Sequence, residues 1–193
     1  MKVIVGLGNP GGKCSFSRHN VGFVFLDLFS KRVAGEHLEV SVKSWSVTDK
    51  YMSLQVGPSP QITLVKPRTF MNKSGIAIKK FVKYNNVKPG DLWVVHDDLD
   101  IKLGEYKIQE GVGPKDHKGV NSIEEQLGFS GFWRIRIGVD NRGLKDRIPG
   151  EDYVLKDFPK EERQKIDEVM EKIFAELIDN YYPKWAKENK NGA

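Results

Sequence analysis

The sequence predicts an α/β fold, a single domain with a twisted, mixed but mostly parallel central sheet and helices on both faces. Short apolar runs typical of buried strands recur, as at residues 3–5 and 92–95. Segments with apolar residues at helical spacing separate them, as at residues 21–33. The length of 193 residues and the absence of repeats favour one domain over residues 1–182, followed by a frayed tail at 183–193.

The first half of the chain alternates strand-like and helix-like patterns. Val21, Val24, Phe25 and Leu28 are spaced as on one helix face, and prolines and glycines mark the boundaries. In order, we expect a strand at 3–5, a helix at 21–33, weak strands at 40–47 and 51–56, a turn at 57–60, a strand at 62–65 ended by Pro67, and a helix from near Asn72 to before Lys88.

The second half continues this alternation and adds the strand that makes the sheet mixed. The last helix is amphipathic, with Ile166, Val169, Met170 and Ile173 on one face. In order, we expect a buried strand at 92–95, a strand at 105–109, a polar loop at 111–118, a short helix at 120–127, a strand at 133–139 and a helix at 160–182.

The composition excludes several classes of protein. Hydrophobic residues make up 39% of the chain, and no apolar run reaches the ~18 residues of a membrane span. The N-terminus lacks a signal-peptide pattern, and Cys14 is the one cysteine, so an internal disulfide is excluded and a cytoplasmic location is expected. One cysteine and four histidines also argue against a structural zinc site.

The charge distribution predicts a polyanionic partner. The net charge is +5, and residues 61–90 hold seven Lys or Arg and no acid. Residues 131–147 hold five bases against two acids, whereas acids gather at 156–176. A solvated surface is the plain alternative, but the segregation favours nucleic acid, bound through phosphates and weakened steeply by salt.

A glycine-rich loop follows the first strand and carries Asn9 to the carboxyl edge of the sheet, where α/β folds bind ligands. Gly6-Leu-Gly-Asn-Pro-Gly11 matches the dinucleotide-binding pattern letter for letter. That pattern requires a helix to open within the motif, whereas Pro10, Gly11 and Gly12 stand there and the helical spacing starts only near Asn20. We therefore predict no nicotinamide cofactor.

A histidine and a carboxylate are expected to meet at the same edge. His19 precedes the first helix, and Asp97 follows the apolar run 92–95. A carboxylate that accepts the Nδ1 proton of an imidazole leaves Nε2 as a base. Strand alternation should turn His96 and Asp98 away, with His96 structural. A divalent metal on Asp97, Asp98 and Asp100 is the weaker alternative, since no fourth ligand is evident.

The chain offers no evident nucleophile. The G-x-S-x-G pattern is absent, Ser15 and Ser17 lie in the loop, and Cys14 is too near His19 in sequence for a typical thiol–imidazole pair. A base without a nucleophile implies direct activation of water, which suits an activated ester. One such base contributes ~10²–10⁴-fold to the rate.

Asn72 and Phe70 lie between a strand and a helix, within Lys66-Pro-Arg-Thr-Phe-Met-Asn-Lys-Ser-Gly75. Asn72 suits either a helix N-cap or an amide that binds substrate. Phe70 suits either the core or a platform for a base or peptide group. The sequence leaves both pairs of alternatives open.

Five segments together resemble the bacterial-type peptidyl-tRNA hydrolase family, in the order of that family and across residues 1 to about 140. They are Val5-Gly-Leu-Gly-Asn-Pro-Gly11, Arg18-His-Asn-Val-Gly-Phe23, Val65-Lys-Pro-Arg-Thr-Phe-Met-Asn-Lys-Ser-Gly75, His96-Asp-Asp-Leu-Asp100 and Arg134-Ile-Arg-Ile-Gly138. The resemblance implies hydrolysis of the ester that joins a peptide to the 3′-terminal ribose of tRNA, which releases peptide and reusable tRNA.

The resemblance also implies roles for single residues. His19 matches the general base and Asp97 the carboxylate that orients it. Asn9 and Asn72 match amides that hold the peptidyl part and the attacking water, and Asn9 is linked to preference for peptidyl-tRNA over aminoacyl-tRNA. Phe70 falls at a substrate-contacting aromatic. Arg136 falls at one half of a basic clamp on the tRNA 5′ phosphate.

The chain departs from the family pattern around the predicted substrate contacts. Cys14 stands where a tyrosine is usual, with Phe16 as a candidate replacement. His117 is kept in the loop and is a predicted substrate contact, but Lys118 replaces a substrate-binding asparagine and is a candidate phosphate contact. Gln109 replaces the other half of the phosphate clamp. Asn121, one helical turn further along, is a candidate source of the missing amide.

The sequence thus favours a cytoplasmic, monomeric esterase that acts on peptidyl-tRNA without metal or cofactor. It would bind the acceptor stem and 3′ end of the tRNA. A non-catalytic RNA-binding protein on the same scaffold is the first alternative, supported by the altered loop. A metal-dependent hydrolase that uses the three aspartates is the second.

Overall fold

Four parallel strands form the centre of the sheet. In the computed structural model, which describes residues 1–12, 15–36, 44–57, 62–143 and 148–184, the strand order is β2-β3-β4-β1-β5-β7-β6. The parallel strands are β4 (Ile62–Pro67), β1 (Lys2–Gly6), β5 (Leu92–Lys102) and β7 (Trp133–Asp140). Every residue of β1 is buried, as expected for a strand covered on both faces.

Antiparallel strands close both edges of the sheet. On one side β3 (Tyr51–Val56) pairs with β4, and the short β2 (Ser46–Val47) pairs with β3. On the other side β6 (Tyr106–Glu110) runs antiparallel to β7, which confirms the prediction that this segment makes the sheet mixed.

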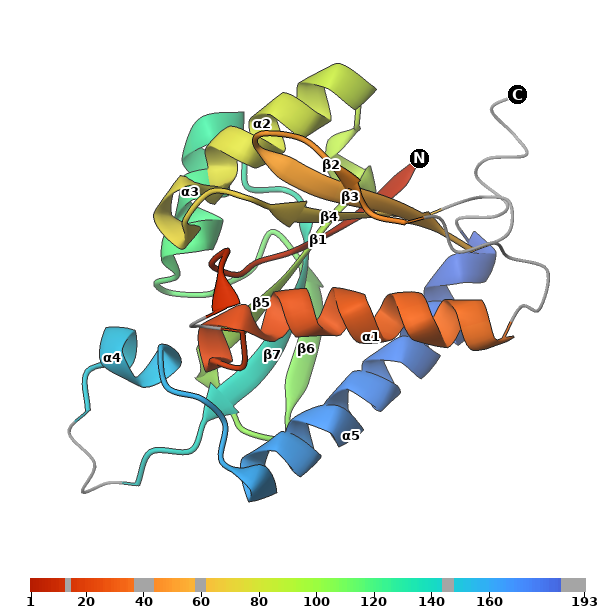
Figure 1. The fold of residues 1–193 in the computed structure, drawn as a ribbon. Helices are drawn as coiled ribbons and strands as arrows, with labels where there is room; N and C mark the ends of the chain where they lie inside the picture. The colour runs from red at the N-terminus through yellow and green to blue at the C-terminus, as the bar shows by residue number, and fades with distance from the viewer. Residues whose placement is uncertain (13–14, 37–43, 58–61, 144–147, 185–193) are drawn as a thin grey trace.

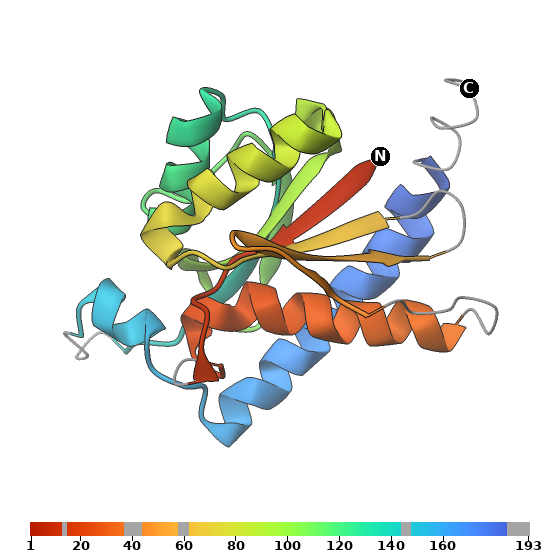
Figure 2. The same ribbon diagram turned by 45° about the horizontal axis from the view of Figure 1, so that its top comes forward.

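Helices cover both faces of the sheet, as predicted (Figures 1 and 2). α1 (Val21–Glu36) and α5 (Lys160–Glu176) lie on one face, and five residues of π-helix (Leu177–Tyr181) continue α5. α2 (Ser74–Asn85) and α3 (Lys118–Leu127) lie on the other. Each helix pair encloses its own apolar cluster, one containing Ile4 and Phe25, the other Val5 and Ile78.

Short helical segments connect the strands to the long helices and to one another. The 3₁₀ turns η2 (Arg18–Asn20) and η3 (Met71–Lys73) lead into α1 and α2, and η4 (Pro89–Asp91) leads into β5. α4 (Gly150–Val154) lies beside the start of α1 (Figure 1). The described helices include none with the length and apolar character that a bilayer span requires.

The largest difference from the sequence prediction is the length of β5, which was expected to end at Val95 and continues to Lys102. Charged residues normally mark the end of a buried strand, but Asp97 and Asp98 remain inside because distant side chains provide their partners. No local pattern reveals those partners.

Other boundaries differ by a few residues. α1 runs three residues past the expected end, β4 includes Pro67, and the helix expected near Asn72 starts as a 3₁₀ turn. Of the strand expected at 40–47, residues 40–43 lie outside the described residues, as do 58–60 of the expected turn. Pro183 and Lys184 are still helical, whereas 185–193 of the expected frayed tail lie outside the described part.

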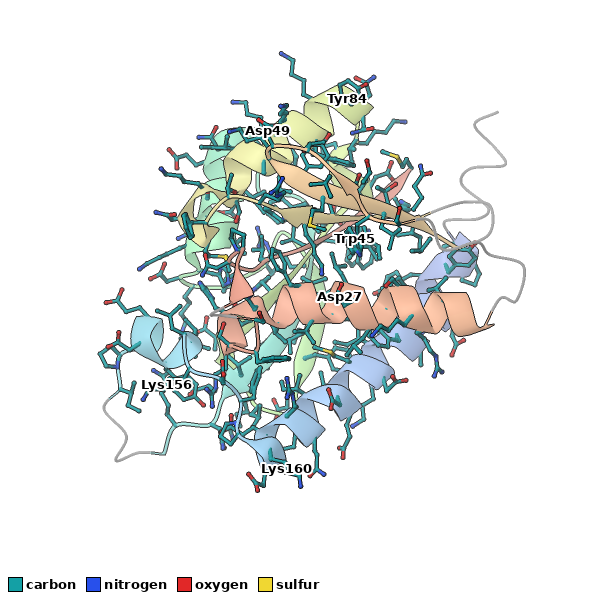
Figure 3. All side chains as sticks on the ribbon, in the orientation of Figure 1. Asp27, Trp45, Asp49, Tyr84, Lys156 and Lys160 are labelled. Carbon is teal, nitrogen blue, oxygen red and sulfur yellow. The ribbon has the colours of Figure 1, made fainter. Side chains whose placement is uncertain are left out.

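Lys66 joins the sheet to the helix layer that contains α1. Its ammonium group pairs with Asp27 of α1 and lies 4.8 Å from the ring centroid of Trp45. Asp27 and Trp45 are labelled in Figure 3. Burial lowers the pKa of Lys66, and the carboxylate of Asp27 opposes this shift. The Lys66–Asp27 pair therefore fixes α1 against β4 while it keeps a buried cation neutralised.

Gly22 allows α1 to approach the ends of β1 and β5. A Cβ atom at this position would lie 2.4 Å from the Leu7 nitrogen and 2.5 Å from the Val95 carbonyl oxygen. Both are backbone atoms, so no side-chain rotation can relieve the contact. The close approach sets the position of η2, the turn that carries His19.

We expect Gly22→Ala to lower the free energy of unfolding by about 1–3 kcal/mol, because the strain of overpacking exceeds the gain in helix propensity. Urea unfolding measures the change. Gly131→Ala is the matched control, since a Cβ there meets no atom within 4 Å. Equal stability of the two variants would contradict the close-packing argument.

Candidate active site

The paired ends of β1 and β5 form the floor of the site. Gly6 lies opposite Val95, and the Leu7 N–H donates to the Val95 carbonyl at 2.9 Å. After β1 the chain loops out and returns in η2, which brings His19 over this edge. Asp97 follows Val95 by two residues in β5. The topology therefore brings together two side chains that are 78 positions apart.

His19 and Asp97 are in direct contact. The Nδ1 atom of His19 lies 2.9 Å from Oδ1 and 3.0 Å from Oδ2 of Asp97, and Asp97 is 2% exposed. An ionised carboxylate only accepts hydrogen bonds, so Nδ1 carries a proton. In the neutral ring Nε2 then holds the lone pair, which is the arrangement of a general base.

Asp97 is charged at neutral pH. Burial by itself would raise the pKa of this carboxyl, because a buried charge loses its hydration. The imidazoles of His19 and His117 outweigh burial and hold the pKa of Asp97 well below its usual value. A charged Asp97 is the acceptor that the proton on His19 Nδ1 requires.

Asn9 is held with its amide nitrogen available. Its Oδ1 accepts the Met71 N–H at 2.8 Å, which assigns the oxygen end of the amide. Asn20 secures the backbone on the other side: its Oδ1 accepts the Asn9 N–H at 2.8 Å, and its Nδ2 donates to the Asn9 carbonyl at 3.0 Å. The Nδ2 group of Asn9 is therefore left to donate to a bound molecule.

These groups line one wall of a cavity of about 750 Å³. His19, Asn9 and Asp97 contribute its catalytic-type side chains. The lining also includes α4 and the residues around it, among them Glu151, Asp152 and Leu155. The volume lies in the range of small-molecule sites, so the base is placed where a substrate end can enter.

Four predicted contact residues also line the cavity: Phe70, Asn72, His117 and Lys118. The core interpretation of Phe70 is wrong, because this ring is 66% exposed. The N-cap interpretation of Asn72 is also wrong, because it lies inside η3, and Lys73 is the N-cap residue of α2. Lys118 pairs with Glu151 at 3.0 Å, so this pair joins the start of α3 to α4.

Arg136 is buried beneath the loop that precedes α3. Its Nε lies 2.7 Å from Oδ2 of Asp98, and its Nη1 lies 2.9 Å from Oε1 of Gln109. A Cβ on Gly113 would lie 2.3 Å from the guanidinium carbon, so the loop backbone packs directly on it. In this arrangement Asp98 already neutralises Arg136, and its predicted contact with phosphate stays a prediction.

Two further predicted residues do not line the cavity with His19. Asn121 hydrogen-bonds to Asp116 and is not among the described residues that line the cavity. Phe16 lies under the guanidinium of Arg163 from α5, 4.5 Å from its ring centroid. Cys14 lies outside the described residues. The substrate contacts expected at these positions therefore stay predictions.

The three aspartates do not converge as metal ligands. Asp98 pairs with Arg136, and Asp100 accepts the Lys115 N–H at 3.0 Å. His19, Asp97 and His117 do gather, with their atoms within 4.8 Å of one another. Both nitrogens that face Asp97 lie 2.9 Å from its Oδ1, which is hydrogen-bond distance. We therefore describe this cluster as hydrogen-bonded.

Sequence reasoning missed the roles of Asn20 and Arg18. Asn20 holds the backbone of Asn9, and Arg18 anchors the turn that carries His19. Arg18 donates to the carbonyls of Lys156 and Asp157 and pairs with Glu162, which fixes η2 to the segment before α5. The signal was available as a run of three polar residues ahead of an apolar helix. Buried polar residues at such a position need specific partners.

His96 is fully buried, and its Nδ1 donates to the Asp97 carbonyl at 2.7 Å. Burial, followed by the proximity of His117, lowers the pKa of His96 to about 3. This ring is thus neutral and outside the cavity, in agreement with its predicted structural role.

A family model described as peptidyl-tRNA hydrolase matches residues 3–190. The chain is 43% identical over 179 residues to a peptidyl-tRNA hydrolase of Pseudothermotoga lettingae, covering 93% of this chain and 89% of that protein. It is 35% identical over 185 residues to one of Neisseria meningitidis serogroup C, covering 96% and 93%. A crystal structure of peptidyl-tRNA hydrolase from Acinetobacter baumannii superposes with a TM-score of 0.78 at 27% identity, covering 95% and 91%.

Proposed function

This chain belongs to the peptidyl-tRNA hydrolase family, a family of enzymes, and from that premise we propose that His19 activates the water that cleaves peptidyl-tRNA. The observation that carries the proposal is the 2.9 Å contact between His19 Nδ1 and Asp97 Oδ1 at the wall of a cavity. This contact leaves the lone pair on Nε2 for a water molecule.

The reaction follows from that lone pair. Nε2 of His19 takes a proton from water as the oxygen attacks the ester carbonyl carbon. The tetrahedral intermediate collapses and breaks the bond between this carbon and the ribose oxygen. The proton on Nε2 passes to the leaving oxygen, which gives a peptide carboxylic acid and a tRNA with a free terminal hydroxyl. The base is regenerated without a covalent enzyme intermediate.

Asn9 is proposed to stabilise the charge that develops on the carbonyl oxygen. Its Oδ1 is occupied by the Met71 N–H, so Nδ2 is the end that faces substrate. A fixed donor costs little reorganisation when the charge appears, which is why such groups are effective in water-poor sites. Met71 holds the side-chain oxygen of Asn9, and Asn20 holds its backbone, which supports this role.

The exposed residues of the cavity are proposed to receive the ends of the substrate. Phe70 offers an exposed ring for stacking on a base or a peptide group. Asn72 follows it in η3 and supplies an amide at the same wall. Lys118 adds a cation, which is proposed to leave Glu151 and pair with a phosphate of the substrate. The pair is 60% and 68% exposed, so it breaks at little cost.

An N-blocked aminoacyl-tRNA tests this proposal. We expect the purified protein to release the blocked amino acid at the same rate with and without a chelator, because His19 supplies the base. Loss of turnover in chelator would contradict water activation by His19 alone. RNA binding without turnover would support the non-catalytic alternative, which the family assignment does not favour.

A further inference from the structure

Both ring nitrogens of His117 are engaged inside the protein. Its Nδ1 accepts the N–H groups of Gly119 at 3.1 Å and Val120 at 3.3 Å, which makes it the N-cap of α3. Its Nε2 lies 2.9 Å from Oδ1 of Asp97. The residue is 5% exposed. His117 therefore has no free polar atom to offer a substrate, although the sequence resemblance placed it among the substrate contacts.

The cap determines the tautomer of the ring. Two N–H groups point at Nδ1, so this nitrogen holds the lone pair and the proton lies on Nε2. The Nε2–H group must then donate to Asp97. Oδ1 of Asp97 thus accepts from two imidazoles at once, those of His19 and His117, whose ring centroids are 4.9 Å apart.

We propose that His117 is a positioning residue, which uses the start of α3 to hold Asp97 in place and to draw part of its negative charge away from His19. This inference rests on the proposed role of His19 as the base. A carboxylate with one donor would rotate more freely and attract a protonated His19 more strongly. The second donor keeps the carboxylate aligned and favours release of the proton from His19.

Other charged groups around Asp97 largely cancel in pairs. His96 is neutral and its ring centroid lies 5.0 Å from that of His117. The groups that face the cluster from β5, β7, the loop before α3, α3 and α4 are His96, Asp98, Asp100, Lys115, Asp116, Lys118, Arg136, Glu151 and Asp152. Three ion pairs join six of them, Asp98–Arg136, Asp100–Lys115 and Lys118–Glu151. Besides His19, His117 is therefore the side chain that acts directly on the charge of the Asp97 carboxylate.

Two substitutions separate the cap from the hydrogen bond to Asp97. His117→Asn keeps an acceptor near the position of Nδ1, and asparagine is a favoured N-cap residue, but its side chain is too short to reach Asp97. His117→Ala loses both interactions. We expect the acidic limb of the kcat profile against pH to move to higher pH by about one unit in both variants. We expect thermal stability to fall further in His117→Ala, which loses the helix cap as well as the hydrogen bond to Asp97.

Three outcomes decide the proposal. A shifted acidic limb in both variants supports it, because loss of the cap alone cannot move the profile of His117→Asn. An unshifted limb in His117→Asn overturns it and leaves His117 a helix cap. Nitrogen-15 NMR of the wild-type ring tests the hydrogen bond without turnover: an Nδ1–H tautomer would overturn the proposal even if His19 proves to be the base. Normal turnover of His19→Ala would instead reject the proposed function.

Discussion

We expect turnover of peptidyl-tRNA to fall by about 10²–10⁴-fold in His19→Ala, the range that one positioned general base contributes. This loss corresponds to roughly 3–5 kcal/mol of transition-state stabilisation. The reason is that no other described cavity residue presents a neutral imidazole nitrogen with its lone pair free, since both nitrogens of His117 are engaged. Single-turnover hydrolysis of an N-blocked aminoacyl-tRNA measures the effect on kcat, and substrate affinity should change little.

His19→Asn provides the matched control for folding. Its amide can donate to Asp97 from the position of Nδ1, so the buried carboxylate keeps a partner, but it carries no base at Nε2. We expect this variant to unfold at nearly the wild-type temperature and to be as inactive as His19→Ala. Near-normal turnover in either variant would remove His19 from the reaction.

Asp97→Asn is expected to lower turnover by at least about 10²-fold, because it disturbs the tautomer of His19. The side-chain amide of the new asparagine has only one oxygen that accepts hydrogen bonds. Its NH₂ group can only donate, so in either orientation it faces the N–H group of a histidine ring. If the NH₂ group faces His19, this ring adopts the other tautomer. Nδ1 then holds the lone pair toward position 97, and Nε2 carries the proton and faces the substrate. The measurement is kcat at a pH where the wild type is fully active.

The same substitution changes the response of stability to acid. The pKa of the Asp97 carboxyl is lower in the folded protein than the ~3.9 of an unfolded aspartate, so its interactions stabilise the fold above that pH. This contribution is lost as pH falls below about 4, since the unfolded chain then binds the proton more readily. The difference in unfolding free energy between wild type and Asp97→Asn, measured in urea, should therefore shrink from pH 7 toward pH 3. A constant difference would show that the carboxylate does not stabilise the fold through its charge.

Much of the fold was predictable because its signals are local. Val3, Ile4 and Val5 are consecutive apolar residues, so exposing either face of this strand to water is unfavourable. They therefore indicate a central strand that is buried on both faces. Val21 and Phe25 repeat with helical spacing and are buried as that spacing requires. The antiparallel β6 was expected from alternation alone, and the contact of His19 with Asp97 followed from the placement of two parallel strand ends at one edge.

The unpredicted features depend on partners far away in sequence. β5 continues through Asp97 and Asp98 because His19 and His117 hydrogen-bond to Asp97 and Arg136 pairs with Asp98. These partners come from three other parts of the chain. Arg136 and Lys118, basic in the sequence, turn out to be paired with acids. The pattern of residues within one segment of the sequence contains no information on such pairs.

The amino-acid sequence alone determined that this chain forms an α/β sheet with a histidine, a carboxylate and an amide at its carboxyl edge, because strand and helix periodicity are written in consecutive residues. Only the tertiary structure decided which way each polar side chain turns. His117 donates to Asp97 rather than to a ligand, Asn9 offers its side-chain nitrogen, and Asp98 pairs with Arg136. A hydrogen bond depends on distance and angle to within a few tenths of an ångström, and that precision arises only when all the elements are packed together.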